Sequence, residues 1–200
     1  MRIPGVCFFE CATSSDIQSN CRSTMAHWCD IKHKVLSGKY YAAEHYKFKY
    51  GNGCLSSLLA HGRVACDIRK ILCIGCETGI YERVLCAQLF GVYDPILTDI
   101  DPKATSVEKL SCTEALAQYT DVDAVMFCLP YFLATGYDIC QYRGKYIIYV
   151  GELETDGHSN PDTLLQDIYA SFDEEHCIAM ARTRPVSCYE HLCVFRRRVS

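Results

Sequence analysis

The sequence lacks the long apolar runs that a membrane protein needs. A transmembrane helix takes about 20 consecutive apolar residues, whereas the longest apolar pieces here, such as residues 124–129, suit a single strand. The N-terminus also shows no basic segment followed by a long apolar stretch, which a secretory signal would have. We therefore expect a soluble, cytoplasmic protein with no membrane partner.

Basic residues are also in short supply. The chain has 20 Lys and Arg against 24 Asp and Glu, a formal net charge of −4, so no broad basic face is available for nucleic acid. Residues 196–198 form an Arg triplet, and short charge runs of this kind are usually solvated tails. Nucleic acid is therefore not indicated as a partner.

Cysteine, in contrast, is abundant, with 15 in 200 residues. The odd count and the absence of a secretory signal favour free thiols in a reducing compartment. Many of the cysteines lie inside apolar runs, where a free cysteine acts as a small hydrophobe. These core positions include Cys73, Cys86, Cys128 and Cys193.

Two groupings of cysteine raise the question of a metal site. Cys73-x-x-Cys76 has no second Cys-x-x-Cys pair at zinc-ribbon distance, and Cys73 lies within a predicted strand rather than at a helix start. We expect neither redox chemistry there nor a metal site elsewhere. A local Cys/His cluster matches the spacing of no common zinc finger, and it consists of Cys21, His27, Cys29 and His33.

The chain divides into an N-terminal helical or irregular extension, residues 1–45, and a main domain, residues 46–200. From residue 70 onward, apolar strand-like segments alternate with helical ones, which predicts a mostly parallel sheet with helices on both faces. Two final strands, 177–183 and 191–196, have no helix between them and predict an antiparallel hairpin at a sheet edge. The other predicted strands are 71–74, 95–100, 124–129 and 145–150, and the predicted helices are 80–90, 113–118, 132–142 and 161–172.

The most informative stretch runs from residue 70 to residue 82. It predicts a buried strand, a turn containing Gly75 and Gly79, and a helix, and the next strand ends in the carboxylate of Asp99. An α/β domain holds an adenosine-containing cofactor with this arrangement. Asp101 and Pro102 follow directly and also predict a helix start, with Asp101 as the N-cap.

The order of these elements resembles the class I S-adenosylmethionine-dependent methyltransferases, over roughly residues 46–196. The resemblance implies a Rossmann-like α/β fold with a mostly parallel seven-stranded sheet, helices on both faces and an antiparallel strand near the C-terminus. It also implies S-adenosylmethionine as the cofactor.

The resemblance assigns residues to the cofactor site. Gly75 and Gly79 match two glycines of the family's turn, while Cys73 stands at its acidic position and Glu77 replaces its middle glycine. Asp99 matches the carboxylate that binds both ribose hydroxyls, and Asp101 is a neighbour able to substitute for it. The full set of cofactor residues that we expect is Gly75, Glu77, Gly79, Asp99, Glu114 and Tyr50.

The acceptor side is less well defined by sequence. Residues 128–131 keep one proline and the aromatic residue of the family's motif for amine acceptors, but Leu129 replaces its polar residue, so transfer to an exocyclic base nitrogen is not supported. Tyr131 is expected to form a wall of the site. Glu152, at the end of a strand, is the expected base or acceptor of a hydrogen bond from a substrate amine.

Two functions follow from these residues. The first is transfer of a methyl group from S-adenosylmethionine to an acceptor that the sequence does not identify, a small molecule or a macromolecule. The alternative is a catalytically inactive protein of this fold that binds a protein partner. A nicotinamide dehydrogenase is disfavoured because Glu77 and Ile80 occupy two of its three glycine positions, and the P-loop motif is absent.

Overall fold

The computed structural model describes residues 62–64, 67–130, 136–153, 161, 163–179 and 190–199. The predicted N-terminal extension and its Cys/His cluster lie outside these residues, as do Tyr50 and Tyr131.

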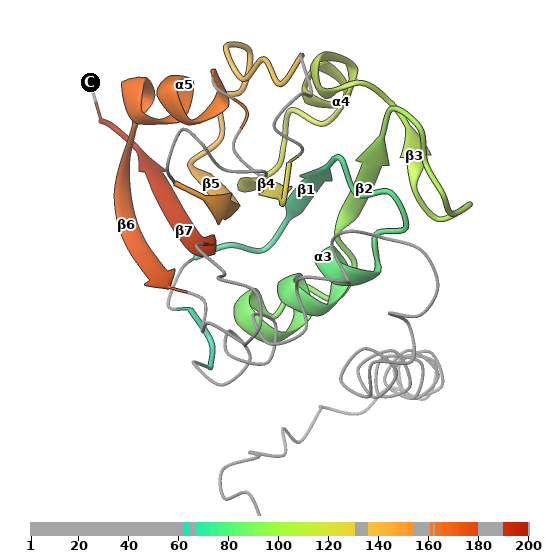
Figure 1. Cartoon of the computed structure of the whole chain (residues 1–200), viewed down its shortest axis with the longest axis horizontal. Coiled ribbons are helices and arrows are strands. Elements are labelled where there is room, and N and C mark those ends of the chain that lie inside the picture. Colours follow the sequence, from blue (N-terminus) through green and yellow to red (C-terminus); the bar gives the residue numbers. More distant parts are fainter. Residues whose placement is uncertain are drawn as a thin grey trace, which may run out of the picture.

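A seven-stranded sheet forms the centre of the domain (Figure 1). The strand order is β3-β2-β1-β4-β5-β7-β6. Strands β1 to β5 pair in parallel, and β7 runs antiparallel to both β5 and β6. The strands are β1 Ile71–Ile74, β2 Ile96–Asp99, β3 Glu108–Lys109, β4 Ala124–Cys128, β5 Tyr146–Glu152, β6 Phe172–Ala179 and β7 Glu190–Arg197.

Every residue of β1 and β4 is buried. Their sequences are continuous apolar runs, which is typical of parallel strands covered on both faces. Helix α3, Ile80–Leu85, continues as the π-helix η1, Cys86–Phe90, and packs on one face. Helices α4, Cys112–Gln118, and α5, Leu164–Ser171, pack on the other. The predicted three-layer fold, including the antiparallel strand near the C-terminus, is confirmed.

The described part of the predicted helix 132–142 is not helical. Residues 136–140 form an irregular segment. Gly136 has a φ of 97°, and the side chain of Asp138 accepts a hydrogen bond from the backbone N–H of Cys140 at 2.8 Å. Such local side-chain bonds give the backbone an alternative to the helix.

The predicted helix start at Asp101 is also wrong. Residues 101–106 contain no helix, and the chain runs irregularly into β3. Asp101 instead forms an ion pair with Lys103, while its backbone N–H donates to Asp99 at 2.7 Å. A capping residue needs a helix whose free N–H groups it can satisfy, and here the local bonds go elsewhere.

The C-terminal hairpin is confirmed, although β6 begins at Phe172 rather than at residue 177. The Arg triplet is not a solvated tail. The guanidinium of Arg197 lies 4.4 Å from the centre of the Phe172 ring and donates to the carbonyl oxygen of Tyr142 at 2.6 Å. Arg198 donates to a carboxylate oxygen of Asp173 at 2.8 Å. The first half of β6 is acidic, as edge strands often are, which is why the sequence did not predict it as a strand. In the fold, Asp173 and Glu175 pair with Arg198 and Arg196.

The strand order reverses at β1. Strands β2 and β3 follow β1 on one side of it, and the next strand, β4, lies on its other side. Ligands of open α/β sheets bind beyond the carboxyl ends of the strands at such a reversal. No helix within the described residues is both long and apolar enough to cross a membrane.

Candidate cofactor site

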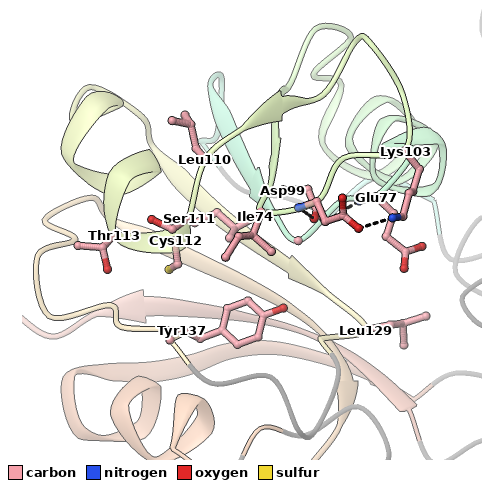
Figure 2. Close-up of a pocket in the computed structure, with 14 residues that line it drawn as sticks. Ile74, Glu77, Asp99, Lys103, Leu110, Ser111, Cys112, Thr113, Leu129 and Tyr137 are labelled. Carbon is pink, nitrogen blue, oxygen red and sulfur yellow. Dashed lines mark hydrogen bonds and ion pairs between the residues drawn. The ribbon is translucent and has the colours of Figure 1, made fainter.

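A cavity of about 410 Å³ lies at the carboxyl ends of β1, β2 and β4 (Figure 2). It therefore opens where the strand order reverses. Its walls come from segments far apart in the sequence: Ile74, Gly75, Glu77, Asp99, Ile100, Asp101, Lys103, Leu110, Ser111, Cys112, Thr113, Leu129, Gly136 and Tyr137.

The turn after β1 begins at Gly75, next to the side chain of Tyr137. The backbone N–H of Gly75 donates to the carbonyl oxygen of Thr98 at 2.9 Å, which holds the turn against β2. A Cβ at Gly75 would come within 2.9 Å of the Tyr137 hydroxyl oxygen, and Gly75 has a φ of 75°. Only glycine takes this conformation and this close approach without strain.

Glu77 has a left-handed backbone with a φ of 54°, in the region that favours glycine. Its N–H donates to Oδ2 of Asp99 at 2.8 Å, and its carbonyl oxygen accepts from the N–H of Lys103 at 2.9 Å. A non-glycine residue in this region costs about 1–2 kcal/mol. These two hydrogen bonds to neighbouring segments hold the turn in its glycine-like shape.

Asp99 is the central polar group of the cavity. Its side chain is buried, and its two carboxylate oxygens accept from the backbone N–H groups of Glu77 and Asp101 at 2.8 and 2.7 Å. An ionised carboxylate has about four acceptor sites. Because the two backbone N–H groups use two of them, Asp99 retains capacity for the two hydroxyls of a diol.

Asp99, Glu77 and Lys103 lie on one side of the cavity in Figure 2. Asp101, which also lines this side, pairs with Lys103. The hydrogen bond between them lowers the pKa of the Asp101 carboxyl and raises the pKa of the Lys103 ammonium. Both groups are therefore charged at neutral pH, and Lys103 offsets part of the negative charge on this side.

The opposite side of the cavity is the start of helix α4. Ser111 is the N-cap, and its side chain accepts from the backbone N–H of Glu114 while the Glu114 carboxylate accepts from the N–H of Ser111 at 2.8 Å. This capping box fixes the segment that carries Cys112 and Thr113 into the wall. Burial raises the pKa of the Cys112 thiol to about 12, so it is protonated at neutral pH.

Of the residues predicted from the sequence for the cofactor, the structure places Gly75, Glu77 and Asp99 in the cavity lining. Gly79 and Glu114 lie outside the lining. Gly79 precedes α3, and a Cβ there would come within 2.4 Å of Leu97 Cδ1, so its position serves helix-to-sheet packing.

Glu152 also lies outside the cavity lining, at the carboxyl end of β5. Its carbonyl oxygen accepts from the Tyr149 hydroxyl at 3.2 Å. Leu129 does line the cavity, and its own φ is 49°. The backbone after β4 is therefore held in a conformation that side chains rarely adopt.

Sequence reasoning missed several lining residues, of which Tyr137 is the largest. Its ring lies across the cavity from Ile74 in Figure 2 and meets the Phe127 ring edge-on, with 5.5 Å between ring centres. The sequence predicted a helix over residues 132–142, so Tyr137 was not recognised as a residue of the cavity. Lys103 and Ser111 were missed because they lie in connections without periodicity; the Ser111-x-x-Glu114 spacing was the one available signal.

No known protein-family model matches the chain, and no curated protein sequence matches it. Several solved structures are similar at low identity. A dimethyladenosine transferase from Plasmodium falciparum has 16% identity and a TM-score of 0.41, with 73% of this chain covering 61% of that one. The N-methyltransferase NodS from Bradyrhizobium japonicum WM9, in complex with S-adenosyl-L-homocysteine, has 11% identity and a TM-score of 0.49, with 85% and 97% covered.

A SAM-dependent methyltransferase from Archaeoglobus fulgidus has 16% identity and a TM-score of 0.42, with 66% of this chain and 87% of that one covered. The fold assignment rests on the sheet itself. Five parallel strands in the order β3-β2-β1-β4-β5 are followed by an antiparallel β7 inserted between β5 and β6. The chain has the Rossmann-like fold of the class I methyltransferases and resembles that family.

Proposed function

We propose that the cavity binds S-adenosylmethionine and that the protein transfers its methyl group to an acceptor. The observation that carries this proposal is the placement of Asp99. A buried carboxylate at the end of β2 has both oxygens oriented by backbone N–H groups and still has acceptor capacity facing a cavity at the strand reversal. This arrangement suits the two adjacent hydroxyls of a ribose.

The neighbouring residues fit the rest of such a cofactor. Ile100 follows Asp99 and is 70% exposed, so it offers an apolar surface for a purine base, with Leu110 also in the wall. The turn from Gly75 to Glu77 is assigned to the methionyl part by the family resemblance. Bound S-adenosylmethionine would supply an electrophilic methyl group on a sulfonium.

The chain's contribution to transfer would be positioning and exclusion of water. Methyl transfer needs a nucleophile aligned with the methyl group. Holding these two reactants in line and away from water accounts for much of the rate. Leu129 and Tyr137 border the cavity with apolar surface. Cys112 is protonated and is not a nucleophile in this scheme. Tyr131 and Glu152 stay predictions for the acceptor side, and a cytoplasmic location stays part of the proposal.

The second candidate is a protein of this fold that binds a partner without catalysis. Glu77 is the residue that favours it, because the resemblance places the cofactor's own carboxylate near the middle position of the turn. Two carboxylates at close range repel each other unless one is protonated or a cation lies between them. Glu77 lines the cavity, and the Lys103 ammonium, whose pKa Glu77 helps to raise, lies in the same wall.

Calorimetric titration with S-adenosylmethionine and S-adenosylhomocysteine separates the two candidates. The proposal predicts micromolar binding, about −8 kcal/mol, that Asp99→Ala abolishes. Asp121→Ala is the control, since the exposed Asp121 carboxylate pairs with Lys70 and lies outside the cavity lining. Absence of heat with either ligand at millimolar concentration would overturn the proposal and leave the partner-binding function.

A further inference from the structure

Two cysteines face each other across the C-terminal hairpin. Cys177 of β6 is the register partner of Cys193 of β7, and their sulfur atoms lie 2.8 Å apart. Both are free thiols. The pair lies on the strands farthest from the cavity, beyond β5, and has no part in the proposed function.

The backbone at this pair is already suitable for a disulfide. Residues directly opposite in antiparallel strands have Cα atoms about 4.5–5.5 Å apart, within the range of about 4.4–6.8 Å that disulfides span. The S–S bond is about 2.05 Å long, so the sulfur atoms of Cys177 and Cys193 need to approach by less than about 1 Å. A small side-chain rotation supplies this movement.

The two thiols differ in their access to solvent. Cys177 is exposed on the edge strand, whereas Cys193 is fully buried in the core. A dissolved oxidant therefore reaches Cys177 first. Cys193 is then in contact with the oxidised sulfur and shielded from competing thiols, which is the arrangement of a reacting and a resolving cysteine.

Glu174 adds a carboxylate on the same side of the hairpin. Residues three apart on a strand normally face opposite ways, but a bulge between Glu174 and His176 brings Glu174 and Cys177 to one face. The Glu174 carboxylate and the two sulfur atoms lie within 4.8 Å of one another. Burial raises the pKa of both thiols, so the reduced pair is uncharged at neutral pH and its reaction with a peroxide requires loss of the Cys177 proton and is faster at higher pH.

We propose that Cys177 and Cys193 form an oxidisable dithiol that a hydroperoxide converts to a disulfide joining β6 to β7. The Cys177 sulfur, on losing its proton, attacks the peroxide and breaks the O–O bond, giving a sulfenic acid and water or an alcohol. The Cys193 sulfur then displaces the hydroxyl as a second molecule of water. The two thiols together lose two protons and two electrons, and the peroxide takes up both.

A metal site made by the same three side chains is the competing use. Two thiolates on a tetrahedral zinc ion, each about 2.3 Å from the metal, lie about 3.7 Å from each other. The observed separation of 2.8 Å is shorter, so a metal would have to push Cys177 and Cys193 apart. The geometry favours a covalent bond between the sulfurs.

Peptide mapping of the full chain tests the disulfide. The reduced protein is treated with hydrogen peroxide, remaining thiols are alkylated, and the protein is digested with trypsin without reductant. We expect a linked pair of peptides, one with Cys177 and one with Cys193, that lacks two hydrogens and separates on reduction. The tryptic peptide of Cys193 also contains Cys188, which lies outside the described residues.

Variants assign the bond. The link should persist in Cys188→Ser and in Cys140→Ser, an exposed cysteine that serves as the control, and should vanish in Cys193→Ser. Because the decisive linked peptide is read in chains that keep Cys177 and Cys193, a folding defect in Cys193→Ser does not affect the result. Loss of the link in Cys188→Ser would overturn the proposal. So would alkylation of both thiols after peroxide, or protection of both by added zinc chloride with no linked peptide.

Discussion

Glu77 has a side chain on a backbone conformation that favours glycine. Its φ of 54° belongs to glycine, yet hydrogen bonds to Asp99 and Lys103 hold it in place. A side chain on a left-handed backbone costs about 1–2 kcal/mol, and the folded turn tolerates this cost. Glu77 is one of the residues that line the cavity.

Glu77→Gly should therefore improve two properties together. Removal of the left-handed strain should raise the free energy of unfolding by up to about 1 kcal/mol, since glycine also gives the unfolded chain more freedom. Removal of the carboxylate should tighten S-adenosylmethionine binding, measured by calorimetry. Glu77→Ala keeps the strain and loses the charge, so it should improve binding only. Weaker binding by both variants would show that Glu77 is itself a cofactor ligand.

Gly79→Ala should destabilise the protein through the start of α3. The added Cβ would lie 2.4 Å from Leu97 Cδ1 at a φ of 70°, and strain with a local packing clash costs about 1–3 kcal/mol. Urea unfolding measures the loss. Gly62→Ala is the matched control, because its φ is 78° and no described atom lies within 4 Å of the added Cβ. Equal losses in both variants would assign the whole effect to the backbone.

Among the described elements, the β6–β7 hairpin has a pair of facing cysteines that a covalent bond can join. Cys177 and Cys193 are 16 residues apart, and closing a loop of this size removes unfolded-state entropy worth about 3 kcal/mol. The oxidised protein should have a higher urea midpoint than the reduced protein by a corresponding amount. A chain carrying Cys193→Ser should show no difference between oxidising and reducing conditions. An oxidised wild type that is no more stable would mean that the native hairpin is strained by the bond.

The elements also show which parts of the site a sequence can predict. The turn from Gly75 to Gly79 and the carboxylate of Asp99 follow buried strands directly, so strand prediction places them. Tyr137 lies in an irregular segment, and its contact with the ring of Phe127, ten residues earlier, arises from the fold and not from a helix or strand repeat. Periodicity carries no information about such contacts. The side of the cavity formed by the turn after β1 and by Asp99 was therefore predictable from the sequence. The side formed by Tyr137 was not.

At the scale of the whole molecule, several exposed carboxylates contribute to the response to acid. The pKa of Asp121 is lowered by its hydrogen bond to Lys70, that of Glu114 by Ser111 and that of Asp138 by the backbone N–H of Cys140. A carboxyl whose pKa is lower in the folded state stabilises the fold above its unfolded pKa and loses that contribution as pH falls. The protein is thus stabilised at neutral pH by charges that acid removes.

The free energy of unfolding should accordingly fall as pH drops from about 5 to about 2, measured by urea unfolding at several pH values. Asp121→Asn removes one ionisable member of a pair with Lys70 and should flatten the curve in this range. A free energy that is constant or rises toward pH 2 would contradict the assignment of these carboxylates as stabilising when charged.

The central claim concerns the occupant of the cavity beside Asp99. A crystal structure of the protein with S-adenosylhomocysteine tests it most directly. The account predicts that the two ribose hydroxyls donate to the Asp99 carboxylate, which still accepts from Glu77 and Asp101. A ligand bound elsewhere, or a cavity without ligand at saturating concentration, would contradict the account.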